Sequence, residues 1–216
     1  MGSIESDSVL SFFSQRCCQN PDNTAIDDGP NGKLSYSQLD QQSSALAYCL
    51  QQNGITAGQV IPLLTTSRLE MVIAVLGILK AGGVYVPIDV DQWPADRINY
   101  VLSRTCSGLV VYTGDNIPSG VSLEEECRTV QVQIWPESAL ETQYEPNRRP
   151  QLMCIIFTSG TTDKPKGVMI PHSSVARFVT SPGFNYDIVP GDRLLLVLSV
   201  AFDGMFNPLF SLNRRN

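Results

Sequence analysis

Residues 158–167 carry the side chains with the clearest chemistry in the chain. They read TSGTTDKPKG and contain four hydroxyls, two glycines and two lysines. Glycine allows the backbone to turn so that successive N–H groups converge on an anion, hydroxyls add donors, and lysine supplies a compact positive charge. Charge-assisted hydrogen bonds of this kind contribute roughly 1.5–3 kcal/mol each. The composition is typical of a loop that binds a polyphosphate.

Composition also leaves a second interpretation open, a polar surface turn that happens to be rich in Ser, Thr and Lys. The segment is not a Walker A loop, because Gly167 is followed by Val168 and the pattern G-x-x-x-x-G-K-[ST] requires Lys and then Ser or Thr. Other observations must decide between the phosphate loop and the surface turn.

Strands alternating with helices precede the loop and must position it. The apolar run at residues 152–157 predicts a buried strand that ends where the loop begins, with Cys154 as a small buried hydrophobe. Upstream, apolar spacing predicts helices at 37–53, at 67–81 with a capping box from Ser67 to Glu70, and from Pro94 to Leu102. Strands are expected at 59–64, 84–87 and 109–112. This alternation predicts an α/β fold with a largely parallel sheet.

Residues 113–150 differ in character, because they contain four prolines and only a short strand-like stretch at 130–134. We interpret them as a loop-rich connection over the surface. The acidic triplet at 124–126 is interpreted as a solvated face, since consecutive residues point in different directions. No metal site is predicted: the only histidine is His172, and no C-x-x-C pair occurs.

Charge and hydropathy exclude several classes of protein. The 216 residues include 15 Lys and Arg against 21 Asp and Glu, a formal net charge of -6 that argues against a nucleic-acid partner. The longest uncharged apolar run, residues 71–79, is far shorter than the roughly 20 residues that cross a bilayer, so no membrane span is expected. The acidic N-terminal stretch lacks the pattern of a secretory signal. We therefore expect a cytoplasmic chain with reduced cysteines.

The run IIFTSGTTDKPKGVMIPH around the loop resembles the signature phosphate-binding loop of the adenylate-forming superfamily. That superfamily includes acyl-CoA synthetases, luciferases and the adenylation domains of non-ribosomal peptide synthetases. Residues 79–102 resemble its second core motif and residues 34–40 its first. Residues 201–203 resemble the start of the fourth motif, whose aspartate pairs with the α-ammonium of an amino acid in the peptide-synthetase branch. The motifs occur in family order and favour that branch, a group of ligases of secondary-metabolite biosynthesis.

The resemblance implies a fold, an activity and a set of site residues. Residues 1–216 would be the N-terminal portion of an AMP-binding adenylation domain, with the C-terminal subdomain absent. The reaction implied is attack of a carboxylate on the α-phosphorus of ATP, with Mg²⁺, followed by transfer to the pantetheine thiol of a carrier protein. Asp203 would orient the amino acid, and Lys166 would be catalytic. The phosphates would be held by Thr158, Ser159, Gly160, Thr161, Thr162, Lys164, Lys166 and Gly167.

The sequence also departs from the family pattern. Asp163 stands where glycine is usual, and a carboxylate beside a triphosphate weakens binding through like-charge repulsion. Asn207 and Pro208 replace a common aromatic–acidic pair, and the matched motifs end before those for adenine, ribose and the C-terminal lysine. Two hypotheses follow: an adenylation fragment with nucleotide binding and impaired turnover, or a non-catalytic remnant that serves as a protein-binding module. For Asp203 the alternative is a helix N-cap.

Overall fold

The fold is taken from a computed structural model, which describes residues 8–65, 68–136, 150–158, 164–181, 192–196, 199–201 and 206. The helices are α1 (Val9–Gln19), α2 (Tyr36–Gln52), α3 (Arg68–Lys80), α4 (Ala95–Thr105), α5 (His172–Thr180) and the short 3-10 helix η2 (Gly29–Asn31). The strands are β1 (Thr24–Asp27), β2 (Lys33–Ser35), β3 (Val60–Thr65), β4 (Val84–Asp89), β5 (Leu109–Tyr112), β6 (Arg128–Gln131), β7 (Leu152–Thr158) and β8 (Lys166–Pro171).

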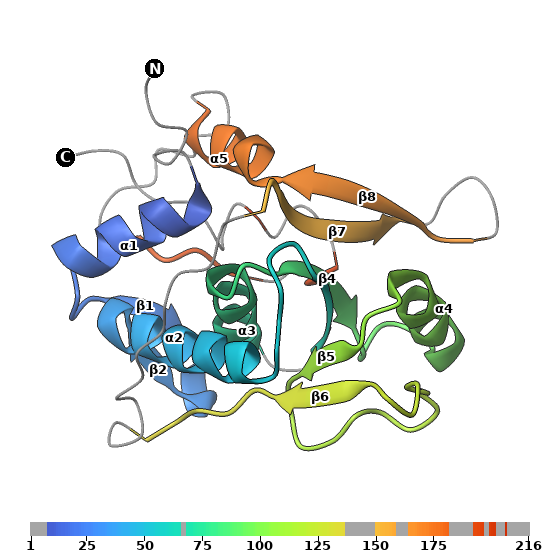
Figure 1. The fold of residues 1–216 in the computed structure, drawn as a ribbon. Coiled ribbons are helices and arrows are strands. Elements are labelled where there is room, and N and C mark those ends of the chain that lie inside the picture. Colours follow the sequence, from blue (N-terminus) through green and yellow to red (C-terminus); the bar gives the residue numbers. More distant parts are fainter. Residues whose placement is uncertain are drawn as a thin grey trace.

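The central sheet has six strands in the order β6-β5-β3-β4-β7-β8 (Figure 1). Its first five strands are parallel, and only β8 runs antiparallel, to β7. Strands β1 and β2 form a separate antiparallel pair. The prediction of an α/β fold with a largely parallel sheet is thereby confirmed.

Helices cover both faces of this sheet. Ile61 and Leu63 of β3 belong to a core cluster with α1, α2, α3 and α5, whereas Leu64 belongs to a second cluster with Ile98 and Val101 of α4. Successive side chains of a strand point to opposite faces, so α3 and α4 must lie on opposite faces, as Figure 1 also shows. Connections on opposite faces leave a crevice at the carboxyl ends of the strands, where open α/β sheets bind ligands.

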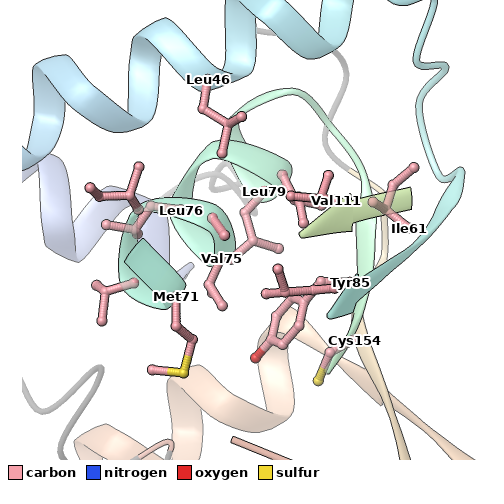
Figure 2. Packing of buried hydrophobic residues seen from close by; sticks show 14 of the residues in the cluster. Leu46, Ile61, Met71, Val75, Leu76, Leu79, Tyr85, Val111 and Cys154 are labelled. Atoms are coloured by element: carbon pink, nitrogen blue, oxygen red, sulfur yellow. The ribbon is translucent and has the colours of Figure 1, made fainter. Parts of the chain in front are cut away.

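Helix α3 is the centre of the larger cluster. Its apolar residues are buried almost all round, because it lies between the sheet and α2. Figure 2 shows Leu46 of α2 directed onto α3, where its side chain lies against Gly77. Helix α2 begins with a capping box in which Ser35 and Gln38 satisfy each other's backbone N–H groups. The capping box expected for α3 includes Ser67, which lies outside the described residues.

Most elements agree with the expectations from apolar spacing. The strand-like stretch expected at 130–134 is β6, which ends earlier, at Gln131. The buried strand before the loop extends to Thr158, and Cys154 within it is fully buried. Residues 166–171 form an additional strand, β8, whose backbone groups pair with β7. No helix among the described residues is long and apolar enough to span a membrane.

Candidate phosphate-binding site

The candidate site lies at the end of the β7–β8 hairpin. Strand β7 is held in the sheet by its apolar residues, of which Met153 and Cys154 are fully buried. Thr158 at its end is exposed and pairs across the hairpin with Lys166, the first residue of β8. The hairpin therefore presents a hydroxyl and an ammonium side by side at the carboxyl edge of the parallel strands.

Lys164 and Lys166 supply the positive charge of the site. Both are exposed, and neither forms an ion pair with any residue in the described part of the chain. An ammonium that lacks a carboxylate partner keeps its charge available for an anionic ligand. Among the other expected site residues, Ser159, Gly160, Thr161, Thr162 and Asp203 lie outside the described residues.

Cys154 of β7 and Tyr85 of β4 are buried in the core and take no part in binding an anion. Burial raises the pKa of the Cys154 thiol to about 12, so it stays protonated and non-nucleophilic at neutral pH. Burial also raises the pKa of Tyr85, on the adjoining strand β4, well above its usual value, with the nearby Cys154 adding to the shift. The two side chains lie close together in Figure 2 and fill the core beneath the site.

Gly167 has a packing role in addition to the loop role expected for it. A Cβ at this position would lie 2.9 Å from Cγ2 of Ile155 and 3.2 Å from Cζ of Phe157. The absence of a side chain therefore allows β8 to approach the Phe157 ring, which is buried in the cluster with α4. Glycine here sets the spacing of the hairpin that carries both lysines.

Replacing Gly167 with alanine should lower the free energy of unfolding by about 1 kcal/mol, because the new methyl group forces Ile155 or Phe157 to shift. Urea unfolding measures the change. Gly108→Ala is the matched control, since a Cβ there meets nothing within 4 Å. Equal stabilities of the two variants would contradict the packing role.

The carboxyl ends of the neighbouring strands carry further polar side chains. The Thr113 hydroxyl, after β5, donates to the Thr65 hydroxyl at the end of β3 over 3.1 Å. Asp89, at the end of β4, accepts a hydrogen bond of 2.6 Å from the Ser199 hydroxyl. Apolar spacing does not single out this pair. The available signal was an aspartate at the end of a buried strand, whereas its partner is distant in sequence.

No metal centre accompanies the candidate site in the described residues. No group of three His, Cys, Asp or Glu side chains there is placed to hold a metal ion. His172, the first residue of α5, is buried, and its backbone N–H donates to the carbonyl of Gln151 beside β7. Among the described residues the site thus presents the Thr158 hydroxyl and the two lysines, groups suited to an anion.

Known proteins match almost the whole length of this chain. The model of the AMP-binding enzyme family matches residues 13–212. Nonribosomal peptide synthetase criC of Aspergillus cristatus is 84% identical over 211 residues, which cover 98% of this chain and 10% of that protein. Nonribosomal peptide synthetase pboA of Aspergillus ustus is 50% identical over 204 residues, again 10% of its length. The chain thus spans about a tenth of these relatives.

Solved structures show the same fold. The N-terminal subdomain of Klebsiella oxytoca NpsA, in complex with 3-hydroxybenzoyl-AMSN, superposes with a TM-score of 0.76 at 26% identity. The match covers 95% of this chain and 51% of that one. The AMPPNP-bound form of the nonribosomal peptide synthetase FmoA3 has a TM-score of 0.78 at 24% identity and covers 96% of this chain and 22% of that chain, a likeness of fold. The chain belongs to the AMP-binding enzyme family, as a fragment similar to the adenylation domains of nonribosomal peptide synthetases.

Proposed function

We propose that the chain binds ATP at the end of the β7–β8 hairpin and serves in the activation of an amino acid or another carboxylic acid as its acyl-adenylate. The observation that carries the proposal is the pair of exposed lysines, without ion-pair partners among the described residues, beside Thr158 at the carboxyl edge of the sheet. Membership of the AMP-binding enzyme family supports the same function.

In this reaction a carboxylate oxygen attacks the α-phosphorus of ATP, the bond to the bridging oxygen breaks, and pyrophosphate leaves. Catalysis of such a step consists mainly of positioning and charge neutralisation. Lys164 and Lys166 offset the negative charge of the phosphates, and the Thr158 hydroxyl and the loop residues donate hydrogen bonds. Asp203 pairs with the ammonium of an amino acid substrate. Mg²⁺ bound with the nucleotide would offset part of the negative charge of its phosphates.

A carrier protein is the acceptor proposed for the activated acid. Its pantetheine thiol attacks the carbonyl carbon of the acyl-adenylate and AMP leaves. One structural relative is an artificially fused adenylation–PCP di-domain of Klebsiella oxytoca, with a TM-score of 0.76 at 26% identity. That relative supports the choice of partner.

Thermal unfolding with and without ATP and Mg²⁺ tests nucleotide binding. We expect the midpoint to rise with nucleotide concentration, because a ligand that binds only the folded state stabilises it, by about 2.7 kcal/mol at a hundredfold excess over Kd. Lys166→Ala should abolish most of the rise. The matched control is Arg104→Ala, which removes one exposed positive charge from the last turn of α4.

ATP–pyrophosphate exchange with a panel of amino acids tests the chemistry separately. Exchange that disappears in Lys166→Ala and persists in Arg104→Ala would establish acid activation. A nucleotide-dependent midpoint without exchange would establish binding alone. If neither signal appears, the chain is instead a non-catalytic remnant, and the exposed Val168 and Met169 on β8 become the surface to test for protein contact.

A further inference from the structure

The hydrogen bond between Asp89 and Ser199 joins two segments that are 110 residues apart in sequence. The Ser199 hydroxyl donates to Oδ2 of Asp89 over 2.6 Å, and its oxygen accepts the backbone N–H of Ala201 over 3.3 Å. Ser199 is therefore used both as donor and as acceptor. The next residue, Val200, is buried in the core cluster that surrounds α3.

Asp89 is held rigidly on its own side of this contact. It is the last residue of β4, and its other carboxylate oxygen accepts the N–H groups of Asp91 and Gln92, each over 3.2 Å. Its carbonyl accepts the N–H of Trp93 over 3.0 Å. These bonds close a turn immediately after the strand, so the oxygen that faces Ser199 has little freedom. The carboxylate is thus a fixed anchor at the edge of the sheet.

The anchor lies beside the start of the proposed phosphate loop. Strands β4 and β7 are parallel neighbours, with Tyr85 paired to Cys154. Four residues further along each strand, Asp89 stands level with Thr158. Both are the last residues of their strands, so the segment at Ser199 and the end of the hairpin meet at one edge of the sheet.

We infer that Asp89 and Ser199 are positioning residues, which hold residues 199–201 near the end of β7, where the proposed phosphate loop begins, so that the acid substrate meets the nucleotide. The inference rests on the proposed function. Asp203 follows Ser199 by four residues. An extended chain spans at most about 3.6 Å per residue, so the Cα of Asp203 can lie no more than about 14 Å from that of Ser199.

Amide hydrogen exchange of Val200 tests the tether. In Ser199→Ala this amide should exchange about tenfold faster than in the unaltered chain, because a hydrogen bond to a charged group is lost. Ser199→Thr keeps a hydroxyl and should restore slow exchange. The control is Ser103→Ala, which removes a hydroxyl that bonds within α4, to the carbonyl of Tyr100. Unchanged exchange in Ser199→Ala would overturn the inference.

ATP–pyrophosphate exchange tests positioning as distinct from a purely structural role. In Ser199→Ala and Asp89→Asn the amino acid concentration at half-maximal rate should rise about tenfold while that of ATP stays unchanged. The double variant should need no higher amino acid concentration than either single variant, since both substitutions remove the same hydrogen bond. Faster amide exchange with unchanged amino acid dependence would also overturn the inference. Silence of the unaltered chain would contradict the proposed function, and amide exchange would then decide the tether by itself.

Discussion

Replacement of Lys80 with alanine should lower the free energy of unfolding by about 3 kcal/mol. Lys80 lies at the end of α3 and is only 7% exposed. Its ammonium lies within 2.9 Å of four oxygens of α2: the carbonyl and Oδ1 of Asp40 and the hydroxyls of Ser43 and Ser44. It also lies 5.5 Å from the centre of the Phe13 ring. The alanine variant loses these contacts and leaves a cavity between helices.

Lys80→Met removes the charge of the side chain but keeps most of its packing, so it separates the two contributions to stability. Methionine fills the space of the aliphatic stem, so Lys80→Met should cost less than Lys80→Ala, which urea unfolding at about pH 7 measures. Equal costs for the two variants would contradict the cavity argument. If Lys80→Ala left the free energy of unfolding unchanged, the stabilising role of the ammonium's hydrogen bonds would be contradicted as well.

The pH dependence of the same pair checks the electrostatics. Burial lowers the pKa of Lys80 below its ordinary 10.5, although Asp40 opposes the shift. Between the lowered value and 10.5 the unfolded chain binds more protons than the folded one, so folded-state stability rises with pH across that window. The unaltered chain should therefore gain stability relative to Lys80→Met as pH increases toward 10.5. An opposite slope would show that Asp40 outweighs burial.

Gly77→Ala should lower the free energy of unfolding by about 2 kcal/mol, although alanine favours a helix by about 1 kcal/mol over glycine. A Cβ at Gly77 would lie 2.6 Å from Cδ2 and 2.9 Å from Cβ of Leu46 on α2. The Cβ of Leu46 is attached directly to the backbone, so a change of rotamer cannot relieve that contact. Helices α2 and α3 would have to move apart, and Leu46 is fully buried between them.

The cycle with Leu46→Gly identifies the cause of the loss. That substitution removes Cβ, Cγ and Cδ2, the three nearest atoms, so Gly77→Ala should cost far less in its background. Urea unfolding of the four chains gives the coupling, and Gly108→Ala provides the control for a glycine in open space. Additive losses would show that the crossing of α2 and α3 does not depend on the missing methyl group.

The order of helices and strands could be predicted from the sequence because the signals are local. Apolar spacing in α2, the buried run of β4 and the stretch before the loop each reflect contacts of one element with one core. Strand β8 was harder, because its side chains are largely exposed and its pairing with β7 satisfies mainly backbone groups. A pattern of buried residues gives little sign of such a strand.

The candidate site, too, could be predicted from the sequence only in part. The Ser, Thr, Gly and Lys content of residues 158–167 indicates phosphate chemistry before any fold is known. The packing of Gly167 against Phe157, and the bond from Ser199 to Asp89, depend on which strands are neighbours. Nothing in the local sequence states that β4 lies beside β7.

The sequence by itself determined the class of fold and the positions of the elements around the central sheet, and it predicted a phosphate loop at residues 158–167. Its apolar periods were sufficient for the elements, since each is expressed within a few turns or strands. Only the tertiary structure decided that Lys80 is buried against α2, that Gly77 must have no side chain and that Asp89 stands level with Thr158. Such features depend on packing between segments tens of residues apart, which is determined when the whole core closes.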